Sequence, residues 1–424
     1  MRASRYRWYV VSVFFSFVLL HQADKLLISP LTVPIMDEFG ITKTQMGAVS
    51  TVALVVAAVL YPIWGYLYDR FARAKLLALA SFIWGGTTWL NALAPNYRTF
   101  LVTRASTGID DSSYPGMYSL LSDYFGPRVR GKIFGIIQLA QPLGFLVGTV
   151  LATMLGGTLG WRNVFLVTGS LGIVVAVFIF FGVREPVRGQ AEPEMQGTAP
   201  VESPRINWEV AKGLLRKRSF LVLLIQGFFG VFPWQVLTFW FFAYLQTERG
   251  YDDGWAMLTM IVAILALSGG YYLGGSLGDH FFRRTARGRA LTAMVGVLAG
   301  TVFLLITLSV PADQKVLFLL PLVPMGLTMS MASPNVIATV QDVAEPEVRG
   351  TAQAIMSLAD NIGAALAPLI AGAIADRWSL HVAILSICVA TWLLCAVFFA
   401  VVARLVPHDV AQLRETMRER AAGA

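Results

Sequence analysis

Long apolar stretches, separated by short polar segments, occupy almost the whole chain. Each stretch is close to or above the roughly 20 residues that a helix needs to cross a bilayer. The stretches are continuous and lack the alternating polarity of a membrane β-strand, so the pattern predicts helices. Twelve spans are expected, at 8–36, 44–68, 74–93, 98–124, 129–157, 161–183, 219–248, 254–279, 288–309, 314–341, 348–375 and 379–404. This is the pattern of an all-α integral membrane protein.

The segment 184–218 interrupts this pattern between the sixth and seventh spans. Its first part is rich in Pro, Gly and Glu and predicts a flexible linker. Its second part has the apolar spacing of a short amphipathic helix on the membrane surface, formed by Ile206, Trp208, Val210 and Leu214. Four regions are therefore expected: a six-helix bundle at 1–183, a cytoplasmic linker at 184–218, a second six-helix bundle at 219–406 and a cytoplasmic tail at 407–424.

Two short motifs occur in both halves in the same order. The first motif is Gly, Asp and Arg at four-residue intervals, found at Gly65, Asp69 and Arg73 and again at Gly275, Asp279 and Arg283. The second is an arginine followed fourteen residues later by a glycine, found at Arg130 and Gly144 and again at Arg349 and Gly363. Repetition of this kind predicts two duplicated six-helix units.

Composition and charge agree with a membrane protein. Of 424 residues, 56% are hydrophobic and only 14% are charged, too few to cover a soluble protein of this size. The net charge of +8 is unevenly distributed: 25 Lys and Arg lie on the side of the termini and 6 in the opposite loops. This asymmetry predicts that both termini are cytoplasmic in a plasma (inner) membrane. It explains the excess of basic residues without a nucleic-acid partner.

The chain lacks the sequence patterns of an enzyme. Cys388 and Cys395 are the only cysteines, and their spacing indicates packing residues on one helix face. We find no metal-ligand spacing, nucleophile motif or phosphate-binding loop, so we expect no catalysis, no metal or other cofactor and no use of ATP. A membrane receptor or a structural membrane protein remains a non-transporter alternative.

The stretch "TRASTGIDDSSYPG" (103–116) carries three charges within the fourth span. A charge near the bilayer centre costs roughly 2.5–3.5 kcal/mol. In a continuous helix Arg104 and Asp111 share a face, whereas Asp110 is rotated by about 100° from Asp111. Intramembrane charges usually face a cavity and pair with one another. The alternative is a buried ion network that transports nothing.

The first span adds further polar candidates, His21, Asp24 and Lys25. We expect them to surround one polar site together with Arg104 and Asp111. Candidates in the second half are Gln226, Trp234, Gln235, Asn335, Asp360 and Asn361. Trp234 and Trp240 are expected to contribute to an apolar wall for an acyl chain, although aromatic residues facing lipid would give the same pattern.

Six plus six spans, the linker and the repeated Gly-x-x-x-Asp motif resemble the major facilitator superfamily. The resemblance implies twelve helices in two pseudo-symmetric bundles and secondary active transport by alternating access. It also implies gating roles at the cytoplasmic side for Gly65, Asp69, Arg70, Arg73, Gly275, Asp279 and Arg283.

A narrower resemblance to the Spinster-like branch is carried by "QADK", "TRASTGIDDSSYPG", "VREPVRGQAE" and "GGYYLGGSLGDHFFRRTARGR". It implies proton-coupled movement of lysolipids or sphingoid phosphates. Asp24 and Asp111 would titrate, while Lys25 and Arg104 would pair with them or contact an anionic headgroup. This chain has Lys25 where the family has arginine and Asp111 where it has glutamate, which leaves the order of proton and substrate binding open.

The segments "YPGM" and "GWRNVF" also resemble organic-anion symporters of the same superfamily. A carboxylate or sugar-acid symporter and a drug efflux carrier are therefore alternatives. The expected partners are a small amphiphilic or anionic solute, protons and membrane lipids, and the expected state is a monomer.

Overall fold

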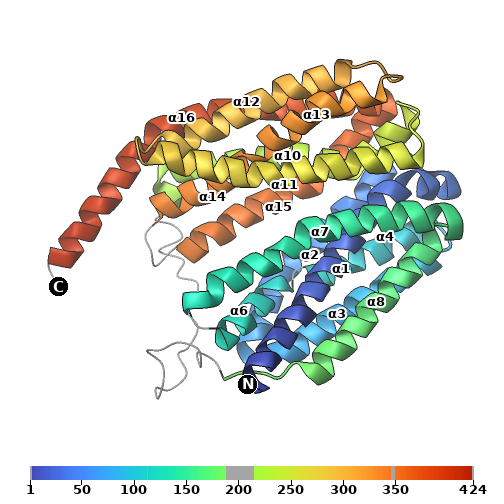
Figure 1. Ribbon diagram of the computed structural model, residues 1–424, viewed down its shortest axis with the longest axis horizontal. Coiled ribbons are helices and arrows are strands. Elements are labelled where there is room, and N and C mark those ends of the chain that lie inside the picture. Colours follow the sequence, from blue (N-terminus) through green and yellow to red (C-terminus); the bar gives the residue numbers. More distant parts are fainter. Residues whose placement is uncertain (1, 112, 126, 188–213, 345–348, 423–424) are drawn as a thin grey trace. The chain divides into compact units, whose positions relative to one another are not determined.

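The computed structural model describes residues 2–111, 113–125, 127–187, 214–344 and 349–422 (Figure 1). Within these ranges the regular structure is entirely helical. The chain divides into two compact units, Met1–Ser203 and Pro204–Ala424. The division falls inside the interrupting segment 184–218. Most of the predicted amphipathic helix (Ile206, Trp208 and Val210) lies outside the described residues.

The first unit is drawn in blue to green in Figure 1. Its helices are α1 (Arg2–Phe39), α2 (Lys43–Arg70), α3 (Arg73–Leu93), α4 (Tyr97–Ser106), α5 (Gly108–Asp111), α6 (Tyr114–Tyr124), α7 (Pro127–Leu159) and α8 (Trp161–Gly182). The most extensive contacts join α1 to α7 and α3 to α8. Local signals define several ends: Thr42 and Gln45 form a capping box at the start of α2, and Gly160 adopts a positive φ of 76° before α8.

The second unit is drawn in yellow-green to red. Its helices are α10 (Arg218–Thr247), α11 (Asp253–Phe282), α12 (Gly288–Ser309), α13 (Lys315–Ser330), α14 (Ala332–Val343), α15 (Arg349–Arg377) and α16 (Leu380–Ala422). Helix α10 packs mainly on α15 and α16, while α12 packs on α13 and α16. The predicted last span and tail form one continuous helix, α16.

Within the described ranges, eleven helical segments are long and apolar enough to cross a membrane. They match the predicted spans except the fourth, at 98–124. That span is divided into α4, α5 and α6, each too short to cross alone. Together these three helices extend from Tyr97 to Tyr124, so the twelve-span architecture is retained with a discontinuous fourth member.

Polar groups satisfy the backbone where the fourth span is interrupted. The Thr107 hydroxyl, between α4 and α5, donates to the carbonyl of Arg104 at 2.7 Å. The carbonyl of Ile109 accepts a hydrogen bond from the Trp64 indole N–H at 2.6 Å. Non-helical backbone at membrane depth needs such partners, because no water is available to hydrogen-bond it.

Two glycines allow helices of the first unit to approach at backbone distance. A Cβ atom on Gly148 of α7 would clash with the carbonyl oxygen of Ala23 in α1. A Cβ atom on Gly108 of α5 would clash with the carbonyl oxygen of Ala53 in α2. Small residues at such contacts are the usual basis of close helix packing in membranes. They position α1 and the interrupted fourth span beside their neighbours.

Candidate functional site

The imidazole of His21 and the carboxylate of Asp110 form a short polar contact inside the first unit. His21 Nε2 lies 2.5 Å from Asp110 Oδ2, and both side chains are almost completely buried. Trp84 and Phe17 pack on the imidazole ring with centroid separations of 5.3 and 5.8 Å. Two titratable groups thus share a hydrogen bond in an aromatic environment that water does not reach directly.

Asp24 lies one helical turn after His21 on α1 and is 4% exposed. Its carboxylate accepts a hydrogen bond from the Thr168 hydroxyl of α8 at 2.9 Å and one from the Thr88 hydroxyl of α3 at 3.4 Å. Two hydroxyl donors partly replace the water that a carboxylate loses on burial. Asp24 therefore joins α1 to α3 and α8, while His21 joins α1 to α5.

Arg104 lies at the end of α4 and is 7% exposed. Its guanidinium carbon is 5.9 Å from the centroid of Phe165 on α8. Phe165 is one turn before Thr168, the partner of Asp24, so Arg104 and Asp24 approach the same part of α8. Lys25 is half-buried on α1. Asp111 ends α5, and its side chain lies outside the described residues.

The predicted candidates of the second unit are distributed over several helices. Asp360 of α15 lies against α10, where a Cβ atom on Gly227 would clash with its Oδ1 atom. Gln226 of α10 is buried, and its amide N–H lies 3.8 Å from the sulfur of Cys395. Trp234, Gln235 and Asn361 are half-buried.

Two other residues of the second unit hold helices together. Asn335 of α14 is 2% exposed, and its amide donates to the carbonyls of Gly274 at 2.8 Å and Met331 at 2.9 Å. Trp240 is completely buried, and its indole N–H donates to the carbonyl of Pro368 at 3.0 Å. These contacts use the polar atoms of both side chains in packing, which leaves Trp240 buried rather than forming part of an apolar wall.

In the first unit, Arg73 connects several elements through charges. Its guanidinium lies 2.6 Å from Asp123 of α6 and 2.8 Å from Glu185, which follows α8, and it donates to Ser119 at 2.9 Å. Arg73 is only 3% exposed.

The other gating candidates of this motif belong to the preceding helix, α2. Arg70 is exposed, with its guanidinium carbon 4.7 Å from the Tyr66 ring centroid. Gly65 and Asp69 belong to α2, but the surroundings of Gly65 and the side chain of Asp69 lie outside the described residues.

The second unit has a corresponding network around a different arginine. Arg289, near the start of α12, contacts Asp279 of α11 at 2.7 Å and also Asp342 of α14. Arg283, which the motif spacing aligns with Arg73, is exposed and makes no ion pair within the described ranges. Gly275 lies in ordinary contact with Pro334, at 3.7 Å from an added Cβ atom. In each unit, therefore, an arginine at the start of the third helix (α3 or α12) forms the charged network.

Three carboxylates that bind His21, Arg73 and Arg289 were not among the site candidates chosen from the sequence: Asp110, Asp123 and Asp342. Asp123 and Asp342 could have been found from the sequence. They lie seven residues before Arg130 and Arg349, the arginines of the second repeated motif. Asp110 was visible as an intramembrane charge, but periodicity within one helix does not reveal its partner His21 on another helix.

Comparison with known proteins agrees with this architecture. The sequence profile of the Major Facilitator Superfamily matches residues 13–368, with a second match over 288–422. The protein spinster of Drosophila melanogaster is 28% identical over 396 residues, which cover 89% of this chain and 63% of the Drosophila protein. A probable L-galactonate transporter of Escherichia coli is 23% identical over 387 residues, covering 88% of this chain and 84% of that protein.

Solved structures share the fold of this chain. The crystal structure of a bacterial homologue of the human lysosomal transporter spinster, in an inward-facing and unoccupied conformation, superposes with a TM-score of 0.81 at 18% identity. The match covers 97% of this chain and 98% of the bacterial protein. Spinster proteins are thus among the proteins that this chain is similar to, and the chain belongs to the major facilitator superfamily.

Proposed function

We propose that this protein is a proton-coupled secondary active transporter that moves an amphiphilic anion, such as a lysolipid or a sphingoid phosphate, by alternating access. The observation that carries the proposal is the buried His21–Asp110 pair, with Asp24 one turn along α1 and Arg104 approaching the part of α8 that binds Asp24. Kinship with spinster proteins supports an amphiphilic substrate, and the interrupted fourth span supports a binding role, since discontinuous membrane helices commonly form transport sites.

The His21–Asp110 pair is a suitable proton acceptor. With one proton between imidazole and carboxylate, the pair has no net charge whichever atom holds the proton. A second proton gives the pair a charge of +1. In a poorly hydrated interior that change alters the affinity for an anionic group far more than it would in water. Proton binding and headgroup binding are thereby linked.

Asp24 and Arg104 have complementary roles in this proposal. Asp24 is a second titratable carboxylate, and loss of its charge would weaken the hydrogen bonds from Thr168 and Thr88. Arg104 supplies a permanent positive charge for the headgroup. Asp111 and Lys25 remain predicted members of the same site.

A sugar acid is the second candidate substrate. The similarity to the probable L-galactonate transporter of Escherichia coli and the motif "YPGM" at 114–117 favour it. Both candidates are anions, so the charged cluster of the first unit suits either headgroup. They differ in the acyl chain, which only the amphiphilic substrate has.

Flux measurements in proteoliposomes test the proposal. Purified protein is reconstituted, and uptake of a radiolabelled lysophospholipid is compared with that of L-galactonate, each with and without an imposed pH gradient. Arg104→Ala is measured alongside. We expect gradient-dependent lysolipid flux in the wild type and its loss in Arg104→Ala. Flux of L-galactonate alone would support the second candidate, and flux of neither solute would contradict transport of both substrate classes.

A further inference from the structure

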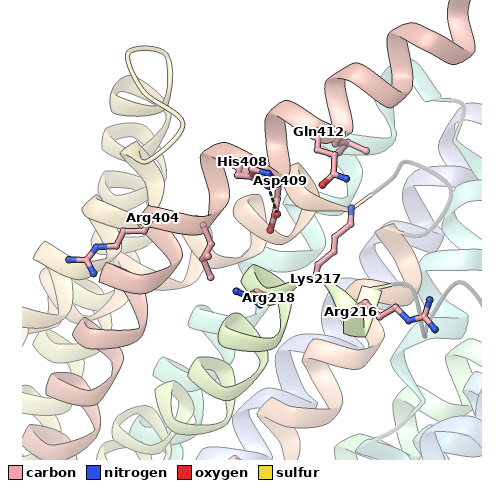
Figure 2. Close-up of a pocket in the computed structure, with 9 residues that line it drawn as sticks. Arg216, Lys217, Arg218, Arg404, His408, Asp409 and Gln412 are labelled. Atoms are coloured by element: carbon pink, nitrogen blue, oxygen red, sulfur yellow. Dashed lines mark ion pairs between the residues drawn. The ribbon is translucent and has the colours of Figure 1, made fainter.

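A basic pocket lies within the second unit, and its lining residues include none of the residues of the proposed transport site. It has a volume of about 630 Å³ and is formed by the start of α10, the two residues before it and the C-terminal part of α16 (Figure 2). Its permanently charged lining residues are Arg216, Lys217, Arg218 and Arg404. Leu405 and Leu413 add apolar surface beside these charges. A pocket of this size is large enough for a small ligand.

The charge of this basic pocket is poorly compensated. Asp409 is the one carboxylate among the lining residues. It accepts a hydrogen bond from the Ser219 hydroxyl and lies 3.5 Å from His408 Nδ1, an ion pair drawn as a dashed line in Figure 2. The lining residues therefore carry four permanent positive charges and one carboxylate. Arg216 and Arg404 extend toward opposite sides of the pocket, and Lys217 extends toward Gln412 (Figure 2).

The helix at the base of the pocket adds to this positive potential. Helix α10 is 30 residues long, has no side-chain cap hydrogen bond at Lys217 and has no acidic residue in its first turn. The positive end of its dipole therefore adds to the potential beside the Asp409 carboxylate that Ser219 binds, and helix N-termini commonly hold phosphate groups. Lys217 is itself fixed, because its Nζ atom donates to the carbonyl of Val343 at 2.8 Å.

The position of the pocket along the chain points to the source of the anion. The predicted seventh span begins at 219 and the twelfth ends at 404, so the sequence places the basic residues at the ends of these apolar spans. Lipid phosphates lie at the same level, and basic pockets between membrane helices bind anionic headgroups. We propose that the basic pocket binds the phosphate of an anionic membrane lipid, with Leu405 and Leu413 against its glycerol and first acyl carbons.

Native mass spectrometry of the purified full-length protein tests this proposal by counting retained phosphatidylglycerol and phosphatidylcholine. The test variant is Arg218→Gln combined with Arg404→Gln. The matched control is Arg284→Gln combined with Arg287→Gln, which removes the same charge from exposed positions between α11 and α12. We expect the test variant to retain about tenfold less phosphatidylglycerol, with phosphatidylcholine unchanged and the control like the wild type.

A second variant is expected to change lipid retention in the opposite direction. Asp409→Asn removes the negative charge of the pocket while keeping an acceptor for Ser219, and it should increase phosphatidylglycerol retention. Equal losses in test and control variants, or no preference for phosphatidylglycerol over phosphatidylcholine, would contradict the proposal. Displacement of the lipid by excess sn-glycerol 3-phosphate would also contradict it, because a soluble phosphate would then suffice. None of these outcomes depends on the transported substrate.

Discussion

At the scale of single residues, the Asp110 carboxylate is the group on which the proposed proton coupling depends most. It is buried within the first unit, and its Oδ2 atom lies 2.5 Å from the imidazole of His21. The amide of an asparagine has nearly the same shape and can still accept a hydrogen bond from a protonated imidazole nitrogen, but it cannot take up a proton. Charge and hydrogen bonding can therefore be separated at this position.

We predict that Asp110→Asn lowers proton-driven flux by at least about tenfold, the effect of roughly 1.4 kcal/mol. Protein yield and thermal stability should remain close to the wild type. Asp37→Asn is the matched control, because Asp37 is an exposed carboxylate on α1. Full gradient-dependent flux in Asp110→Asn would exclude Asp110 from proton coupling.

A second prediction concerns Asp24. Thr168→Val removes the hydroxyl that donates to its carboxylate at 2.9 Å, with little change in side-chain volume. Hydrogen bonds to charged groups contribute about 1.5–3 kcal/mol, so the melting temperature should fall. Thr301→Val is the control, since that buried hydroxyl bonds only to the carbonyl of Val297 in its own helix. Equal shifts in both variants would argue against a charged acceptor at Asp24.

The polar residues of the first and fourth spans could be chosen from the sequence, because each charge in an apolar stretch is costly and therefore conspicuous. The partners of these charged residues could not be chosen from the sequence. The 3.6-residue periodicity that separated Asp110 from the Arg104 face holds only for an unbroken helix. The fourth span is divided after Ser106, and Asp110 in the short helix that follows meets His21.

At the scale of elements, the helices of the first unit are placed by backbone contacts at glycines. Hydropathy predicts spans well because it averages over about 20 residues. It does not predict where a span is interrupted, because that depends on a partner from another helix. Here the partner is Trp64 of α2, whose indole N–H satisfies the carbonyl of Ile109.

We predict that Gly108→Ala and Gly148→Ala reduce the yield of folded protein and its thermal stability, since overpacking typically costs about 1–3 kcal/mol. Each added methyl group would meet a backbone carbonyl that cannot move aside easily. Gly86→Ala is the control, because a Cβ atom on Gly86 of α3 has no neighbouring atom within 4 Å. If all three variants melt at the wild-type temperature, close backbone packing does not position these helices.

At the scale of the whole molecule, duplication is visible in the charged networks of the two units. Arg73 with Asp123 in the first unit corresponds to Arg289 with Asp342 in the second. The repeat of Gly65 and Asp69 was readable from the sequence, but it aligned Arg73 with Arg283. Sequence spacing could not choose between nearby arginines, since the choice depends on which side chain reaches the acidic residue across the helix bundle.

We predict that Arg73→Ala destabilises the first unit by about 3–5 kcal/mol, because it leaves buried or partly buried carboxylates without their cation. Arg70→Ala, at an exposed arginine on the preceding helix, should have little effect on the melting temperature. In the second unit Arg289→Ala should destabilise more than Arg283→Ala. The reverse order in the second unit would show that the motif spacing, rather than the observed contacts, identifies the structural arginine.

The most direct test of proton coupling records the lumenal pH of proteoliposomes that contain an entrapped pH-sensitive dye. A lysophospholipid is added to vesicles with equal pH on both sides, and wild-type protein is compared with Asp110→Asn. The account predicts a substrate-dependent pH change in the wild type and none in the variant. Substrate movement without any pH change in the wild type, or an undiminished pH change in Asp110→Asn, would contradict it.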